Sequence, residues 1–337
     1  MKKTYFIIFA ILLFSSVLKA DEKDGIVHEK RDKEILLKLK KIQTLGDIQE
    51  TNCDLCGCFF GIEPNFAQNS AGIRYSYFKF YSPAHNEPVN PALDHEGHAG
   101  VEETEIYSKV ELFAKYNVNP KLRLLLTLPY KFIDINGKSI KDFGDVSLIG
   151  QYQIYSTAPS LKEESQYRQR VYLGAGIKVP TGAYNKQLEY GVTEAHFQPG
   201  TGAFDFLLSA SYFSKYKALG FNTDVSYSLA TKNKNEYKFG NRFNVTSSLF
   251  YQIEVDQTGL LPHAGIYLEA AEHDKLNEVE DANSGGSVVF ITGGLDIYYS
   301  SLSLNFTYQH PVNDKLYGSQ TPNKFRAVAS LSYYFGM

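Results

Sequence analysis

Every cysteine of the chain lies in one short segment, Cys53-Asp54-Leu55-Cys56-Gly57-Cys58. Three thiolates at this spacing are suited to a soft metal ion, either zinc or Cu(I). The alternative is a local disulfide that leaves one thiol for a partner, which an oxidising compartment favours over free thiolates. Haem attachment is excluded because Gly57, and not a histidine, follows the second cysteine. No cofactor is certain, and zinc or copper stays open.

A second candidate metal site lies between residues 85 and 103, where His85, His95 and His98 stand among acidic residues. The spacing His95-Glu96-Gly97-His98 could hold a divalent metal if the segment folds back on itself. An acidic, solvated loop is the alternative, because nothing in the sequence fixes the ligand geometry. Together with the cysteines, this segment defines one possible function, an exported metal-binding protein that uses the rest of the chain as an anchor.

Enzymatic motifs are missing from the sequence. It has no Gly-x-Ser-x-Gly nucleophile elbow and no phosphate-binding loop. Gly200-Thr201-Gly202 lacks the third glycine and the following helix of a dinucleotide site. Because no nucleophile, base and orienting group are brought together, we expect no enzyme activity.

The first twenty residues predict export. Lys2 and Lys3 precede an apolar stretch, some small residues and a plausible cleavage point after Ala20, which is typical of a cleaved signal peptide over residues 1–20. We expect residues 21–68 to form an N-terminal periplasmic or plug segment, with an amphipathic helix over residues 27–45 that Gly46 ends. This segment could close a barrel or contact a periplasmic protein, and the alternative is a short extension at the barrel mouth.

The composition indicates strands. The chain of 337 residues has 25 Tyr and 23 Phe but no Trp and only 2 Met, which is unlike the composition of helical proteins. Its 34 Lys plus Arg against 37 Asp plus Glu give a net charge of -3, so no nucleic-acid partner is expected.

Polar and apolar residues alternate with a period of two from about residue 70 onward, which is the period of a strand whose faces meet different surroundings. In residues 105–116, for example, Lys109 and Glu111 lie on one face and Val110 and Leu112 on the other. We count twelve such strands, over residues 72–81, 105–116, 122–130, 146–154, 171–179, 204–212, 219–229, 243–251, 264–268, 289–299, 302–308 and 327–335.

The polar faces and the connections favour a membrane barrel over a soluble sandwich, because a sandwich core could not bury so many charges. Long polar connections, including residues 132–143, alternate with short ones, and tyrosines at the strand ends resemble interfacial girdles. The predicted fold is all-β, a transmembrane antiparallel β-barrel of about twelve strands over residues 69–337 in the outer membrane. The predicted lumen-lining charges are Lys109, Glu111, Arg123, Asp145, Lys178, Asp205, Asp224, Arg242, Glu269 and Asp296.

Three glycine-rich phrases add a resemblance: Phe143-Gly144-Asp145, the run from Gly174 to Gly182, and Gln198-Pro199-Gly200-Thr201-Gly202. They resemble the outer-membrane proteins of the phenol meta-degradation pathway family. The resemblance implies a barrel that passes small, often aromatic or apolar, compounds. Its motif residues could contact the solute or serve only the architecture, and we favour architecture because glycine suits crowded rims. They are Gly144, Asp145, Pro180, Thr181, Gly182, Pro199, Gly200 and Gly202.

The charges expected inside the barrel are nearly balanced, whereas a strongly ion-selective pore carries one sign. The cations are Lys109, Lys115, Arg123, Lys131, Arg170, Lys178, Arg242 and Arg326, and the anions are Glu105, Glu111, Asp145, Asp205, Asp224, Glu269 and Asp296. The sequence therefore predicts a channel or transporter for small neutral, apolar or aromatic solutes, with outer-membrane lipid around it. Ion pairs across such a lumen could instead nearly close it.

Overall fold

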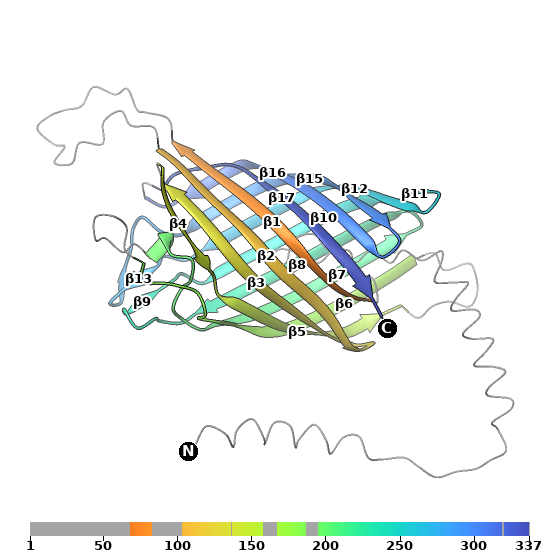
Figure 1. Ribbon diagram of the computed structural model, residues 1–337, viewed down its shortest axis with the longest axis horizontal. Helices are drawn as coiled ribbons and strands as arrows, with labels where there is room; N and C mark the ends of the chain where they lie inside the picture. The colour runs from red at the N-terminus through yellow and green to blue at the C-terminus, as the bar shows by residue number, and fades with distance from the viewer. Residues whose placement is uncertain are drawn as a thin grey trace, which may run out of the picture. The chain divides into compact units, whose positions relative to one another are not determined.

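The computed structural model describes residues 68–82, 103–135, 137–157, 167–186, 195–318 and 320–336. Twelve long strands form one antiparallel sheet that closes on itself, because β1 pairs with β17 and β10 pairs with β12 (Figure 1). These strands are β1 (Asn69–Ser82), β2 (Glu103–Asn119), β3 (Leu122–Ile135), β5 (Val146–Ser156), β6 (Tyr167–Val179), β7 (Asp205–Tyr216), β8 (Leu219–Ala230), β10 (Arg242–Tyr251), β12 (Thr258–Ala271), β15 (Gly286–Tyr299), β16 (Leu302–Leu316) and β17 (Asn323–Phe335). The predicted all-β barrel of twelve strands is confirmed.

The two faces of each strand differ as the alternation predicts. On β2, Leu112 and Tyr116 are 54% and 56% exposed, whereas Glu111 and Lys115 are 3% and 1% exposed. Successive side chains of a strand point to opposite faces, so the exposed apolar set lies outside the barrel and the polar set inside. Exposed leucine, isoleucine and phenylalanine side chains occur around the outside of the barrel. Such a surface suits lipid and not water.

Short connections join the strands at one end of the barrel. Asn119 accepts hydrogen bonds from the backbone N–H groups of Lys121 and Leu122, both at 2.9 Å. Lys217 and Ser300 adopt positive φ angles of 53° and 53° in two further turns at this end. Outer-membrane barrels have their short turns on the periplasmic side, so the opposite end, with the long connections, faces the exterior.

Some long connections contain short strands that the sequence pattern missed. Residues 132–143 were predicted as a loop, which is wrong, because β4 (Lys138–Phe143) pairs with β3 and extends that hairpin. Buried Ile133 and Ile140 face each other across the hairpin. The alternation in β4 covers too few residues to stand out from its charged neighbours.

Further short strands lie outside the twelve of the barrel. β9 (Tyr237–Lys238), β13 (Lys275–Leu276) and β14 (Val279–Glu280) form a small separate sheet in the connections that follow β8 and β12. β11 (Ile253–Val255) pairs with β12 at the periplasmic end. Among the described residues the helical content is one turn, η1 (Ala195–Phe197), and none of the described helices is long and apolar enough to cross a membrane.

The signal peptide and nearly all of the segment 21–68, including the expected helix over residues 27–45, lie outside the described residues. The same holds for the connection between residues 83 and 102. Their predictions remain predictions.

Candidate functional site

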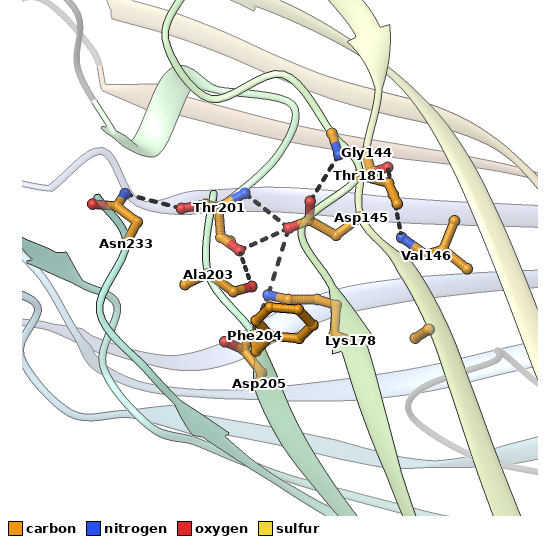
Figure 2. Close-up of polar contacts among 12 residues, drawn as sticks. Gly144, Asp145, Val146, Lys178, Thr181, Thr201, Ala203, Phe204, Asp205 and Asn233 are labelled. Atoms are coloured by element: carbon orange, nitrogen blue, oxygen red, sulfur yellow. Dashed lines mark hydrogen bonds and ion pairs between the residues drawn. The ribbon is translucent and has the colours of Figure 1, made fainter. Parts of the chain in front are cut away.

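The carboxylate of Asp145 joins the three glycine-rich phrases at the exterior end of the barrel (Figure 2). Asp145 directly precedes β5 and is 6% exposed. Its Oδ1 accepts a hydrogen bond from the backbone N–H of Gly182 at 3.0 Å. Its Oδ2 accepts bonds from the backbone N–H and the hydroxyl of Thr201, at 2.8 and 2.7 Å. One carboxylate therefore holds both ends of the connection between β6 and β7.

Three glycines make close backbone contact beside Asp145. A Cβ added to Gly182 would lie 2.7 Å from the carbonyl carbon of Gly144 and 2.8 Å from the Cα of Gly200. A Cβ added to Gly200 would lie 2.5 Å from the carbonyl carbon of Gly182. Any side chain here would push the two segments apart, since such distances are shorter than van der Waals contact. Glycine is needed at this crossing for close packing.

Further hydrogen bonds fix the same connection. The Thr181 hydroxyl donates to the Gly144 carbonyl at 3.2 Å and accepts from the Val146 N–H at 3.0 Å. The Gln198 amide bonds both the N–H and the carbonyl of Lys186, each at 2.8 Å. Asn233, from the connection after β8, donates to the Thr201 carbonyl at 3.0 Å. The part of this connection that the structure describes is therefore held at both ends against the barrel rim.

An exposed ion pair lies on the outer side of this rim. Lys186 is 2.6 Å from Asp142 on β4. The hydrogen bond from Lys186 is the main reason that the pKa of Asp142 is lowered. Both side chains are more than a third exposed, so solvent screens the pair.

Lys178 lies on the inner wall between two carboxylates. Its ammonium forms an ion pair with Asp205 and lies 3.9 Å from Asp145 Oδ2. Asp205 is 5% exposed. The contact links the Asp145 cluster to the interior of the barrel, as Figure 2 shows.

Other interior charges are also paired. Glu111 accepts from Arg74 at 2.6 Å and from Lys109 at 2.9 Å. In a second group, Glu269 is 2.8 Å from Arg326 and 3.9 Å from Arg242. The wall is thus charged but locally neutralised, which lowers its preference for ions of one sign.

Arginine side chains in the interior also lie over aromatic rings. The guanidinium of Arg74 is 4.6 Å from the ring centroid of Phe113, and that of Arg326 is 4.4 Å from that of Phe290. Such contacts stabilise a cation where water is scarce. These two guanidinium groups therefore lie against aromatic rings of the barrel wall.

Apolar clusters occupy the interior between the charges. Leu125, Ile149 and Leu207 pack together with 2%, 0% and 1% exposure. The glycines of the 174–182 run make this possible, because a Cβ at Gly176 would lie 2.6 Å from Ile149 Cγ1. Because Gly176 has no side chain, the Ile149 side chain can pack against the backbone of β6.

A second apolar cluster lies near the periplasmic ends of β7, β10, β12 and β15. It consists of Phe213, Phe250, Leu261 and Tyr298, each at most 5% exposed. The rings of Phe213 and Phe250 stack with centroids 6.0 Å apart. The cluster packs against the inner face of these four strands.

A buried polar group adjoins that cluster. His263 Nδ1 lies 3.7 Å from Asp296 Oδ2, and both side chains are 0% exposed. Asn305 donates a hydrogen bond to Asp296, and Thr307 lies 3.3 Å from His263 Nε2. The group is enclosed, so His263 has no exposed position from which to act on a solute.

Asp274 organises a second group of contacts in the exterior connections. It is 3% exposed and accepts from the Tyr237 hydroxyl at 2.6 Å and from the Gly240 N–H at 2.7 Å. His196 Nε2 lies 3.3 Å from the same carboxylate. Burial and the bond to Asp274 raise the pKa of the Tyr237 phenol well above its usual range.

A cavity of about 450 Å³ lies at the exterior rim, next to this group. The outward-facing side chains of Tyr227 and Phe243 form part of its lining, together with His273 and Tyr317, whose rings stack 4.6 Å apart. It opens on the outer surface of the wall, away from the interior charges.

The ten charges predicted to line the lumen occupy the strand face opposite the exposed apolar side chains. Six of them are at most 6% exposed: Glu111, Arg123, Asp145, Asp205, Asp224 and Asp296. The side chain of Lys178, which forms an ion pair with Asp205, is 21% exposed. Lys109 and Glu269 have side chains 27% and 23% exposed, and Arg242 is the most exposed at 48%. Arg123 lies 3.8 Å above the ring of Tyr172, and Asp224 accepts from Asn222.

The remaining motif residues gather around Asp145. Pro199 is fully buried, and Gly202 has a φ of +70° with the Tyr184 ring against it. Pro180 is half-buried at the end of β6. These contacts agree with an architectural interpretation of the motif, which remains our interpretation.

The predicted metal ligands Cys53, Cys56, Cys58, His85, His95 and His98 lie outside the described residues. Within the described ranges, no group of three or more His, Cys, Asp or Glu side chains could hold a metal ion.

Sequence reasoning missed two contributors. Arg74 lies on β1, whose alternation is weak, yet its spacing from the inward Gly72 and Ser76 would have placed it on the inner face. Asp274 lies outside the twelve barrel strands and carries no motif, so the sequence contains no signal for it.

Comparison with known proteins identifies the family of this chain and a solved structure with a similar fold. Residues 100–326 match the model of the family described as "Putative MetA-pathway of phenol degradation". The chain belongs to this family. Comparison with curated proteins gives no match.

Among solved structures, an outer membrane channel from Pseudomonas putida F1 is similar with a TM-score of 0.54 and 12% identity, over 81% of this chain and 100% of that one. The CymD monoaromatic hydrocarbon channel has a TM-score of 0.40 and 10% identity, over 80% of this chain and 89% of that one. At these identities the first likeness shows a shared barrel fold. The family member described here is an outer-membrane β-barrel, as the sequence predicts.

Proposed function

We propose that this protein is an outer-membrane channel that passes small neutral, apolar or aromatic solutes. The observation that carries the proposal is the interior wall, where ion-paired charges alternate with buried apolar clusters such as Leu125, Ile149 and Leu207. Paired charges do not favour ions of either sign. Apolar and aromatic side chains give weak contact surfaces to a small apolar body.

The width of the barrel supports the same proposal. Twelve strands enclose more space than the eight-stranded barrels that side chains fill, and less than the sixteen-stranded porins. The family description refers to phenol degradation, and the similar structure from Pseudomonas putida F1 is called a channel. We propose that the ten charges named above line the pathway and that no chemical step takes place along it.

The N-terminal segment is part of the proposal. We propose that residues 21–68 either close the periplasmic mouth or contact a periplasmic protein. Deletion of these residues separates a plug from a simple extension.

The test is conductance and solute flux of the refolded mature protein in lipid vesicles, with and without residues 21–68. Because small aromatic solutes also cross lipid unaided, empty vesicles of the same composition give the background rate. We expect flux of benzyl alcohol above background, with an increase when the segment is removed. Background rates from both folded forms would overturn the channel proposal.

A further inference from the structure

Lys131 is an interior cation without a counter-ion in the described part of the chain. It lies on β3, on the inward face that it shares with Pro129 and Ile133, and is only partly exposed. Neither a hydrogen bond nor an ion pair to another described residue engages its ammonium. The other cations around it, Lys109 and Lys178, each have a carboxylate partner.

The electrostatic surroundings of Lys131 are mostly positive. The charged groups with the largest electrostatic effect on its ammonium are Lys178, Asp145, Lys109 and Arg242, and Lys109 is its register partner on β2. Three of these four are cations. The one carboxylate, Asp145, already accepts three hydrogen bonds from Gly182 and Thr201. A partly buried ammonium in such a position attracts an anion from outside the protein.

Apolar groups adjoin the same position. Ile133 is 3% exposed, and Ile140, opposite it on β4, is 8% exposed. Further along the inward face of β3, Leu125 belongs to the apolar cluster with Ile149 and Leu207. A ligand that combined a carboxylate with an apolar body would meet both the cation and the apolar wall.

We propose that Lys131 binds the carboxylate of small aromatic acids inside the exterior half of the barrel, so that the solutes include monoanions of this class as well as neutral compounds. This inference rests on the proposed channel function, because it assigns a solute class to the same interior. Asp145 contributes by positioning: it holds the β6–β7 connection in place while its oxygens are occupied by backbone and hydroxyl donors.

The test is isothermal titration of sodium benzoate and of benzyl alcohol, its neutral counterpart with the same ring, into the full mature protein refolded in detergent. We expect benzoate to bind at least tenfold more tightly than benzyl alcohol. The Lys131→Met variant should lose that difference and keep its affinity for benzyl alcohol within twofold. Lys131→Arg, which retains the charge, should keep most of the benzoate affinity.

The matched control is Lys141→Met, on β4 of the same hairpin, where Lys141 pairs with the outward-facing Phe132 and is exposed. Its benzoate affinity should equal that of the wild type. Equal binding of benzoate by wild type and Lys131→Met, with both barrels folded by circular dichroism, would overturn the inference. Flux of benzyl alcohol, measured on the same preparations, reports on the channel proposal separately, since it needs no anion site.

Discussion

Asp145 and Asp274 are both buried carboxylates that hold exterior connections, at 6% and 3% exposure, yet they differ in their partners. Asp145 is held by two backbone N–H groups and one hydroxyl from Gly182 and Thr201. Asp274 is held by one backbone N–H, a phenol and an imidazole. The Asp145 site depends on glycines that let backbone segments approach each other closely. The Asp274 site depends on side chains that come from separate connections.

This difference has an energetic consequence. Asp145 also lies against the ion pair of Lys178 and Asp205 inside the wall, so its loss disturbs the barrel. Asp274 lies between exterior connections that carry the small sheet of β9, β13 and β14. Its loss should act on those connections alone.

The largest effect is expected for Asp145→Ala. The change removes three hydrogen bonds to a buried charge and should lower the free energy of unfolding by about 3–5 kcal/mol. Urea unfolding in detergent, followed by circular dichroism, measures it. Asp142→Ala removes an exposed carboxylate only three residues away and serves as the control, with little change expected. Equal midpoints for the two variants would contradict the role assigned to Asp145.

The next effect is expected for Gly182→Ala. Its added Cβ would lie 2.7 Å from the Gly144 carbonyl carbon, and relief of that contact should cost about 1–3 kcal/mol of unfolding free energy. Gly150→Ala is the control, because its nearest contact would be 3.6 Å from Leu124 Cδ2. The same unfolding assay compares the two, and a Gly182→Ala protein as stable as Gly150→Ala would show that the crossing tolerates a side chain.

Asp274→Ala should act locally. Loss of the bonds from Tyr237 and Gly240 should destabilise the exterior connections by about 1–3 kcal/mol, while the unfolding midpoint of the barrel stays near that of the wild type. Limited proteolysis with mass spectrometry measures cleavage between residues 231 and 241 and between 272 and 285. Faster cleavage is expected there, and a shift of the whole barrel's midpoint as large as that of Asp145→Ala would remove the contrast between the two sites.

The smallest effect concerns pH. Burial raises the pKa of Tyr237 in the folded protein. Its contribution is therefore complete below the ordinary tyrosine pKa of about 10 and declines as the pH rises beyond that value. Cleavage of the same connections should rise between pH 9 and pH 11 by a factor that is smaller in Tyr237→Phe. An identical pH dependence in both proteins would exclude Tyr237 as the titrating group.

The strand pattern could be predicted because alternation is local. Each of the twelve barrel strands has enough residues for the two faces to be distinguished from sequence, as with Glu111 and Leu112 on β2. The short strands β4, β9, β13 and β14 have at most six residues, and pairing to a neighbour stabilises them more than their own pattern does.

The candidate site could be predicted in part. The glycine-rich phrases marked the positions of Asp145, Gly182 and Gly200, but their meeting depends on the contact of segments that lie 37 and 56 residues apart from Asp145 in the chain. No sequence motif identified Asp274 and its partners. They are ordinary loop residues, and they come together only when the barrel folds.

The sequence by itself determined the number of long barrel strands, the face that most of their side chains occupy and the near balance of interior charge, because these follow from residue type and a period of two. Only the tertiary structure decided which charges meet: Glu111 with Arg74, Glu269 with Arg326, and Lys131 with none among the described residues. The physical reason is that closure of the sheet and the register of its strands set the distances across the interior, and Coulomb interactions depend on those distances.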